Sequence, residues 1–167
     1  MLPITLTPHT LKAGLIGAGD ALARRAALLA EAGVEARLLP PDAPDAALEG
    51  LTLLFVAGLG EGESRLLANR ARGLGVLVNV EDVLPLCDFH VPAIVRRGDL
   101  LLTVSTGGQV PGLSRALREG LAEQFGPEWT ARLRDLAVIR ARWRSEGLSP
   151  AEVSQMVRAK AESEGWL

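Results

Sequence analysis

The first half of the chain alternates short apolar runs with longer segments of helical periodicity. The short runs are rich in leucine and valine and end at polar residues or glycine, which is typical of buried strands; they are residues 11–16, 34–39, 51–57 and 76–78. Helical segments follow at 21–32 and 61–74, while residues 41–50 are too few for a full helix and a further strand. The alternation predicts an α/β fold with a doubly wound parallel sheet.

The second half changes character after one more apolar run, residues 100–105, which we expect to form a strand. Amphipathic helices are predicted at 111–125 and 128–146, separated by Gly126-Pro127. The sequence Ser149-Pro150-Ala151-Glu152 predicts a capping box that starts a last helix ending near Glu164. The tryptophan and leucine positions of these helices are interpreted as core or dimer contacts.

The composition and charge of the chain exclude several classes of protein. The 167 residues suit one compact domain, or one domain with a helical appendage, and 48% of them are hydrophobic against 23% charged. A net charge of −2 gives no reason to expect nucleic acid or an anionic membrane as partner. One cysteine excludes an internal disulfide framework, and no apolar run approaches the ~20 residues of a spanning helix. We therefore expect a soluble, cytoplasmic protein.

A glycine turn lies between the first strand and the first helix. Gly17-Ala18-Gly19 followed by a helix is the opening of a dinucleotide-binding unit, in which the second glycine lets backbone N–H groups approach a pyrophosphate. The third position of that fingerprint is Leu22, so the motif alone also fits a glycine turn of another α/β unit. The acidic residue expected to hold the adenosine ribose is missing from the second strand, and Asp42 is either that residue or a solvated turn residue.

The chemistry is expected around residues 76–112. Asn79, Glu81 and Asp82 follow an apolar run, where a parallel strand delivers polar groups to the carboxyl edge of its sheet, the edge at which ligands bind. A turn at residues 106–108 then leads into a helix, which favours an anionic ligand. Asp82 is predicted as a general base, whereas Glu81 is expected to point the opposite way into solvent.

Three stretches, in this order and spacing, resemble a known family: LIGAGDALARRAALLAEAG from residue 15, LVNVEDVLPLCDFHVPAIVRRGDLLLTVSTGG from 77 and PGLSRALREGL from 111. The family is the N-terminal module of siroheme synthase, also called precorrin-2 dehydrogenase/sirohydrochlorin ferrochelatase. The resemblance covers about residues 11–125 and is diffuse in the C-terminal helices. It implies a Rossmann-type NAD-binding domain at 1–91, a dimerisation segment at 92–122, a helical region at 123–167, and a homodimer.

The resemblance also implies an activity. The family oxidises precorrin-2 to sirohydrochlorin with NAD, and some members also insert ferrous iron as a substrate, which is a lyase activity. The catalytic aspartate of the Asn-Val-x-Asp pattern falls on Asp82. The family's cofactor contacts fall on Asp20, Ala21, Pro41 and Asp42; the glycine turn adds Gly17, Ala18 and Gly19, and Gly58 is expected to contact the cofactor through its backbone. A serine of the family's Ser-Ser-Gly-Gly turn falls on Thr106, so substrate contacts are expected at Ser105, Thr106, Gly107 and Gly108, and Arg115 is added as a candidate for the substrate's carboxylates.

Some residues depart from the pattern or stay ambiguous. Ala57-Gly58-Leu59 stands where the family usually has Ala-Thr-Asp, so a hydroxyl and a carboxylate are missing from one wall of the cofactor site. Because the substrate carries many carboxylates, arginines are candidates to bind it, or are plain surface residues; they are Arg96, Arg97, Arg115 and Arg118. Cys87 and His90 do not specify a metal site, because two ligands are too few; His90 is interpreted as a core or interface residue.

Three hypotheses stay open at this point. The first is an NAD-dependent oxidoreductase acting on precorrin-2, and the second is a regulatory module that binds NAD without turnover. The third is a chelatase, alone or combined with the dehydrogenase. The acid at Asp82 and the long match that follows it favour an enzyme over a sensor.

Overall fold

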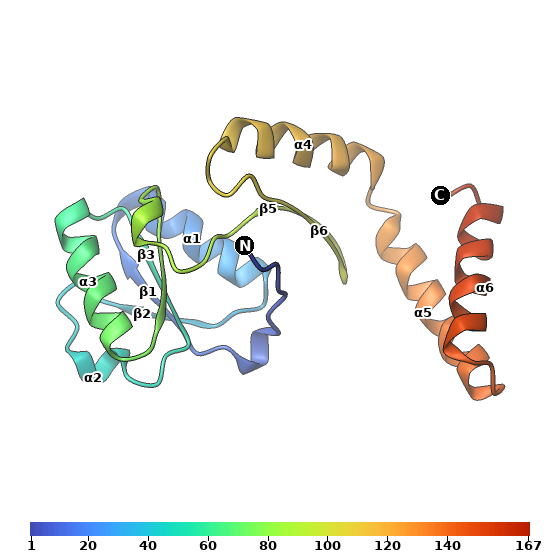
Figure 1. Ribbon diagram of the computed structural model, residues 1–167, viewed down its shortest axis with the longest axis horizontal. Coiled ribbons are helices and arrows are strands. Elements are labelled where there is room, and N and C mark those ends of the chain that lie inside the picture. Colours follow the sequence, from blue (N-terminus) through green and yellow to red (C-terminus); the bar gives the residue numbers. More distant parts are fainter. The chain divides into compact units, whose positions relative to one another are not determined.

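The computed structural model describes residues 1–167, which form two compact units, Met1–Val91 and Pro92–Leu167 (Figure 1). The expected dimerisation segment, 92–122, and the expected helical region, 123–167, both lie in the second unit. No helix is both long and apolar enough to cross a membrane.

The first unit contains a parallel sheet of four strands in the order β2-β1-β3-β4. The strands are β1 (Ala13–Gly17), β2 (Ala36–Leu39), β3 (Leu53–Ala57) and β4 (Leu77–Val80). Each lies within or next to an apolar run of the sequence, so the α/β prediction and the parallel sheet are confirmed. The strand expected from residue 34 begins two residues later, after Gly33 ends the preceding helix with a positive φ of 71°.

Helices cover both faces of this sheet (Figure 1). Helix α1 (Gly19–Glu31) packs its leucines on the face formed by Leu15 and Phe55, and α3 (Glu61–Gly73) packs on the opposite face with Val56 and Val78. Successive strand residues therefore enter different cores, as alternating side chains in a strand must. The abbreviated crossover between β2 and β3 holds a single helical turn, α2 (Asp45–Leu48).

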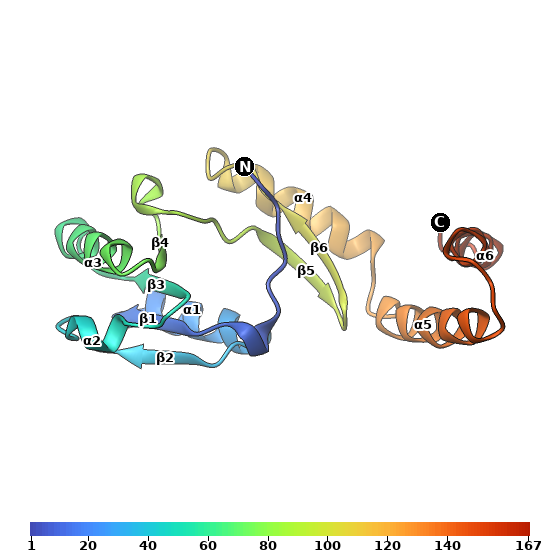
Figure 2. The same cartoon turned by 60° about the horizontal axis from the view of Figure 1, so that its bottom comes forward.

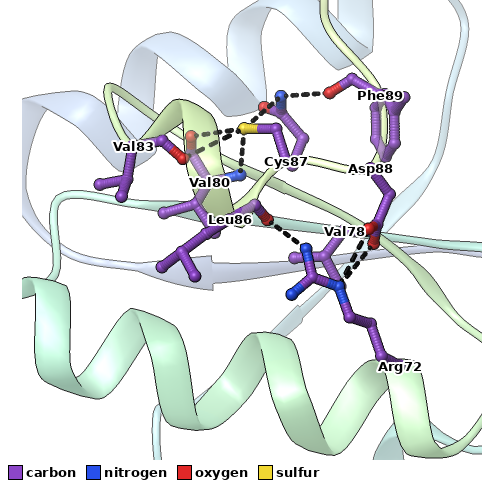
Figure 3. A network of polar contacts seen from close by, with 9 residues as sticks. Arg72, Val78, Val80, Val83, Leu86, Cys87, Asp88 and Phe89 are labelled. Atoms are coloured by element: carbon purple, nitrogen blue, oxygen red, sulfur yellow. Dashed lines mark hydrogen bonds and ion pairs between the residues drawn. The ribbon is translucent and has the colours of Figure 1, made fainter.

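The free edge of β4 is covered by the segment that follows it (Figure 3). The carboxylate of Asp88 accepts from the Val78 N–H at 2.9 Å, and the backbone N–H of Asp88 donates to Val78 O at 2.8 Å. Two residues along the strand, the Cys87 thiol donates to Val80 O at 3.1 Å and its Sγ lies 3.4 Å from Val80 N. Arg72 of α3 holds the segment by donating to Asp88 and to Leu86 O. Side chains thus satisfy edge groups that another strand would otherwise pair with.

The second unit begins with a β-hairpin that the sequence analysis only half anticipated. Strand β6 (Leu100–Val104) was predicted, but its antiparallel partner β5 (Ala93–Arg97) was missed. A two-residue turn, Gly98-Asp99, joins them, with Gly98 at a φ of 59°. Strands rich in β-branched and aliphatic residues around Gly-Asp are a hairpin signal that the sequence carries. Helix α4 (Pro111–Gln124) packs on both strands within one chain (Figure 2).

Two further helices complete the second unit, α5 (Trp129–Ser145) and α6 (Pro150–Ser163). The predicted capping box is confirmed: Glu152 N donates to Ser149 Oγ at 3.3 Å, and Ser149 N donates to the Glu152 carboxylate at 2.8 Å. Trp166, which follows α6, packs on α5: its ring lies 6.3 Å from the ring of Trp129, and the Arg132 guanidinium lies over both rings.

Candidate functional site

The four parallel strands end at one edge of the sheet, so the turns that follow them are neighbours there. This topology brings together the predicted cofactor residues after β1, β2 and β3 and the predicted catalytic residue after β4. The remaining candidates, residues 105–108 and Arg115, lie in the second unit.

The turns after β1 and β3 pack directly on each other. A Cβ added at Gly17 would lie 2.0 Å from Ala57 O, and one added at Gly58 would lie 2.3 Å from Ala18 O. Ala18 N also donates to Ala57 O at 3.0 Å. Gly17 and Gly58 are therefore required by the protein's own backbone, and Gly58 also needs a φ of 71°. The glycine that replaces the family's threonine lets these two turns approach closely.

Gly19 differs from both of these glycines because the space where its side chain would be is open. No heavy atom lies within 4 Å of a Cβ added there, and its φ is 61°. Gly19 is also the first residue of α1, whose first N–H groups have no partner within the helix and no side-chain cap. Asp20 and Ala21 continue this first turn. The arrangement leaves room and donors for an anionic group at the helix N-terminus.

Pro41 and Asp42 lie in a turn after β2, closed by a hydrogen bond from Ala43 N to Pro40 O at 3.0 Å. Both residues are exposed. Because β2 pairs with β1, this turn flanks the Gly17–Gly19 turn at the carboxyl edge, where the ribose of a bound dinucleotide would lie.

Asp82 has a backbone conformation that no other non-glycine residue of the chain adopts, with a φ of 62°. It follows the end of β4 by two residues, in a turn in which Val83 N donates to Val80 O at 3.4 Å. Glycine or asparagine is the ordinary choice for a left-handed position in a turn. An exposed aspartate there presents its carboxylate at the carboxyl edge of the sheet.

Glu81 was expected to be solvated, and this expectation is wrong. Its side chain is only 19% exposed and lies 3.9 Å from Arg24 and from Arg25, both on α1. Glu81 N still donates to Val56 O at 2.9 Å, so the strand alternation continues one residue past β4. It places Glu81 on the same face as Asn79 and Phe55, opposite Val78 and Val80, and the expectation overlooked that α1 covers this face.

Asn79 was expected at the sheet edge with Glu81 and Asp82, but it lies inside β4 and is buried. Its Nδ2 donates to Phe89 O at 2.9 Å and lies 3.6 Å from Cys87 Sγ, while its Oδ1 has no hydrogen-bond partner. Asn79 therefore holds the segment after β4 onto the sheet.

The predicted substrate turn of the second unit is organised by its own hydroxyl groups. Gly107 N donates to Ser105 Oγ at 3.2 Å, and Val110 N donates to Thr106 Oγ1 at 3.2 Å. Thr106 Oγ1 also lies 2.9 Å from Ser114 Oγ on α4, a partner that the sequence analysis did not single out. Gly107 and Gly108 both have positive φ, as a tight turn before a helix needs.

The four candidate arginines divide into two groups. Arg97 donates to the carbonyls of Phe125 and Ala122 at the end of α4, and Arg118 pairs with Glu119, so both have partners within the fold. Arg96 and Arg115 are exposed.

No group of three or more His, Cys, Asp or Glu side chains is arranged to hold a metal ion. The Cys87 thiol is engaged with the edge of β4, and His90 is partly buried.

Arg25 is a site residue that was not predicted from the sequence. Its side chain is 12% exposed, and its guanidinium lies 5.6 Å from the centre of the Phe55 ring. Burial lowers the pKa of Arg25, while the negative charge of Glu81 acts in the opposite direction. The available signal was an arginine at a position of α1 that faces the sheet.

A family described as "Putative NAD(P)-binding" matches residues 4–93. Among curated proteins, the siroheme synthase of Stutzerimonas stutzeri (strain A1501) is 29% identical over 193 residues, covering 93% of this chain and 42% of that protein. The siroheme synthase of Pseudomonas aeruginosa (strain LESB58) is 30% identical over 188 residues, covering 90% and 40%. That of Pseudomonas fluorescens (strain SBW25) is 33% identical over 156 residues, covering 81% and 33%. The chain thus spans less than half the length of these relatives.

Among solved structures, one described as "SirC, precorrin-2 dehydrogenase" superposes with a TM-score of 0.73 at 17% identity, covering 95% of this chain and 88% of that chain. This likeness confirms the fold. Together with the siroheme synthases it confirms the resemblance to the siroheme synthase N-terminal module.

Proposed function

The chain belongs to this NAD(P)-binding family, and we propose that it is a dehydrogenase that oxidises precorrin-2 to sirohydrochlorin with NAD, in siroheme synthesis. The proposal draws on the names of the siroheme synthases and of the precorrin-2 dehydrogenase to which the chain is similar.

The observation that carries the proposal is the conformation of Asp82. A carboxylate at the sheet's carboxyl edge sits on the one left-handed non-glycine backbone of the chain, where glycine or asparagine would be easier to accommodate. Strained backbone of this kind is concentrated at functional sites. A module that only bound a nucleotide would gain nothing from an acid in this position.

The cofactor fits the first unit. The open space at Gly19 and the free N–H groups of the first turn of α1 suit a diphosphate. Asp42 after β2 suits the ribose hydroxyls, and a carboxylate there favours NAD over a cofactor with a 2′-phosphate. When bound, the nicotinamide supplies a hydride acceptor.

The protein's own residues supply the remaining steps. Oxidation removes a hydride and a proton from the substrate, and the carboxylate of Asp82 accepts the proton. The hydroxyls and N–H groups of residues 105–108 and the guanidinium of Arg115 bind substrate carboxylates.

A homodimer is part of the proposal. An apolar row runs from the N-cap of α4 along the helix: it consists of Val110, Leu113 and Leu117, and each of these side chains is 49% exposed. Such an unpartnered apolar row is costly in water. A two-fold contact through α4 would cover it.

The proposal includes a second activity, in which ferrous iron is a substrate that is inserted into sirohydrochlorin and Asp82 assists the insertion.

One assay tests both activities. Purified protein is given precorrin-2 with NAD, with NADP or with no nucleotide, and the absorbance spectrum is followed before and after ferrous or cobaltous ion is added.

We expect the sirohydrochlorin spectrum to develop with NAD, more slowly with NADP and not without nucleotide. Binding of NAD without any turnover of precorrin-2 would replace the dehydrogenase by a regulatory module. Metal insertion into supplied sirohydrochlorin without oxidation of precorrin-2 would replace it by a dedicated chelatase.

A further inference from the structure

Two neighbouring arginines of α1 approach the same carboxylate from different surroundings. Arg24 and Arg25 each place a guanidinium nitrogen 3.9 Å from an oxygen of Glu81. The Arg24 side chain is 66% exposed, whereas that of Arg25 is 12% exposed. Exposed ion pairs contribute little to stability because water and salt screen them. Two charges at the same distance attract each other more strongly when they are shielded from water.

Arg25 is fixed in place by aromatic rings. Its guanidinium faces Phe55, which is buried in β3, and the Phe55 ring meets Phe89 edge to face with the centroids 5.4 Å apart. The buried Asn79 amide holds the backbone of Phe89. The position of the Arg25 guanidinium therefore depends on side chains from β3, β4 and the segment after β4.

Glu81, in turn, is tied to the sheet by its backbone. Its N–H donates to Val56 O at 2.9 Å, and the next residue is Asp82 in the left-handed turn position. With the Glu81 backbone held by β3 and its side chain held by Arg25, the peptide that leads into Asp82 has little freedom to rotate.

We propose that Arg25 is a positioning residue that acts through Glu81: the buried guanidinium fixes the Glu81 side chain, and this restrains the turn that aims the Asp82 carboxylate. The inference rests on the proposed function, in which Asp82 is the base. Arg24 has no such role, because its own side chain is 66% exposed and is screened by water.

The guanidinium of Arg25 and the carboxylate of Glu81 each need the other's charge. A guanidinium withdrawn from water is costly unless it is paired, and burial is the main cause that lowers the pKa of Arg25. Glu81 is the first of the charges that offset this cost. Removing Arg25 would leave Glu81 half-buried without its inner partner, so Glu81 would turn toward solvent and release the turn.

The test compares Arg25→Met, Arg25→Lys and the matched control Arg24→Met. Arg25→Met keeps the length of the side chain without its charge, and Arg25→Lys restores the charge without the planar guanidinium. Hydrogen exchange is measured at the amides of Glu81 and Val83, which need no substrate. We expect about tenfold faster exchange in Arg25→Met, partial recovery in Arg25→Lys and no change in Arg24→Met.

Steady-state kinetics supply the second readout. Arg25→Met should lower kcat by about 10- to 100-fold, the scale for a slightly misplaced catalytic group, with the KM for precorrin-2 and NAD unchanged. Glu81→Gln should do the same, and the double variant should be no worse than either single one, because both act on one contact.

Unchanged amide exchange in Arg25→Met would overturn the inference, and so would a raised KM with an unchanged kcat, which would mean direct contact with substrate. If the wild-type protein did not oxidise precorrin-2, the proposed function would fail, while the exchange experiment would still decide the role of Arg25.

Discussion

The two units of the chain differ in how much apolar surface each encloses. The first unit holds nearly all of the buried apolar side chains, whereas the second contributes only Val95, Val153 and Ala161. Neither α4 nor α5 buries a residue. A parallel sheet with helices on both faces closes its core in one copy, but a hairpin covered by one helix does not.

This difference separates the tasks of the two units. The residues that we assign to the cofactor and to proton transfer lie on the unit that is complete in itself. The exposed apolar row lies on the unit that is not. If this division is correct, changes at the cofactor residues or at Asp82 should alter binding or rate and leave assembly unchanged, and changes in the apolar row of α4 should do the reverse.

The largest expected effect is that of Asp82→Asn. Asparagine tolerates the left-handed backbone and keeps the shape of the side chain, but it cannot act as a base. Precorrin-2 oxidation should slow by ~100-fold or more while NAD affinity, dimer and stability persist. Asp82→Gly, which suits the turn equally well, should be as slow. Wild-type turnover in the Asn variant would remove Asp82 from the mechanism.

Gly19→Asn should come next, with a loss of cofactor affinity. A side chain there enters the open space beside the first turn of α1, and overfilling a fitted site costs about 1–3 kcal/mol, so NAD affinity should fall by roughly 10- to 100-fold. Asparagine is chosen because φ is 61° and a β-branched residue would be strained. Calorimetric titration measures the affinity.

The matched control for Gly19→Asn is Gly75→Asn. Gly75 has a φ of 76° and open surroundings, but it precedes β4 and so lies at the opposite edge of the sheet. Equal loss of affinity in both variants would show that the effect is conformational and unrelated to the cofactor.

Leu117→Glu probes the second unit. A carboxylate within the apolar row should weaken the proposed dimer by about 2 kcal/mol, roughly 30-fold, while NAD affinity stays constant. Leu66→Glu on α3 is the control, since Leu66 is 67% exposed but belongs to the first unit. Light scattering at micromolar protein concentration should show a smaller mass for Leu117→Glu and an unchanged mass for Leu66→Glu. A wild-type monomer at that concentration would refute the proposed dimer.

The smallest expected effect is at the start of α6. Ser149→Ala removes the N-terminal cap and should cost about 1 kcal/mol, without changing the cofactor site. The hydrogen bonds with Ser149 lower the pKa of Glu152, so its contribution is complete above the ordinary carboxyl pKa and is lost as the pH falls through the lowered value. The difference in thermal unfolding between wild type and Ser149→Ala should therefore shrink in acid without vanishing, because Glu152 N donates to Ser149 Oγ whatever the charge of the carboxyl.

The sheet could be predicted from the sequence because its signals are local. Apolar runs of strand length and a glycine turn before an alanine-rich helix specify β1, β3 and α1 without reference to distant residues. The capping box at Ser149 is equally local. By contrast, β5 was missed because its run contains two arginines, and its assignment depends on pairing with β6.

The site was less accessible to sequence reasoning for a similar reason. The position of Asp82 follows from the end of β4, but the surroundings of its neighbours depend on what packs over the sheet. Glu81 faces α1 because that helix covers its side of the sheet, and Asn79 is buried beneath the segment after β4. Arg25 lies on a helix that the sequence predicted, but its role could be recognised only once α1 was placed over Phe55.

The cover on the edge of β4 bears on how the protein behaves when many copies are present. Asp88 and Cys87 occupy the bonding groups through which one sheet could extend into another, so the sheet ends at four strands. The edge of β4 is therefore closed to strands from further copies, the kind of contact that can add copies without limit. In a crowded solution, two side chains thus keep this edge of the sheet from growing into a fibre.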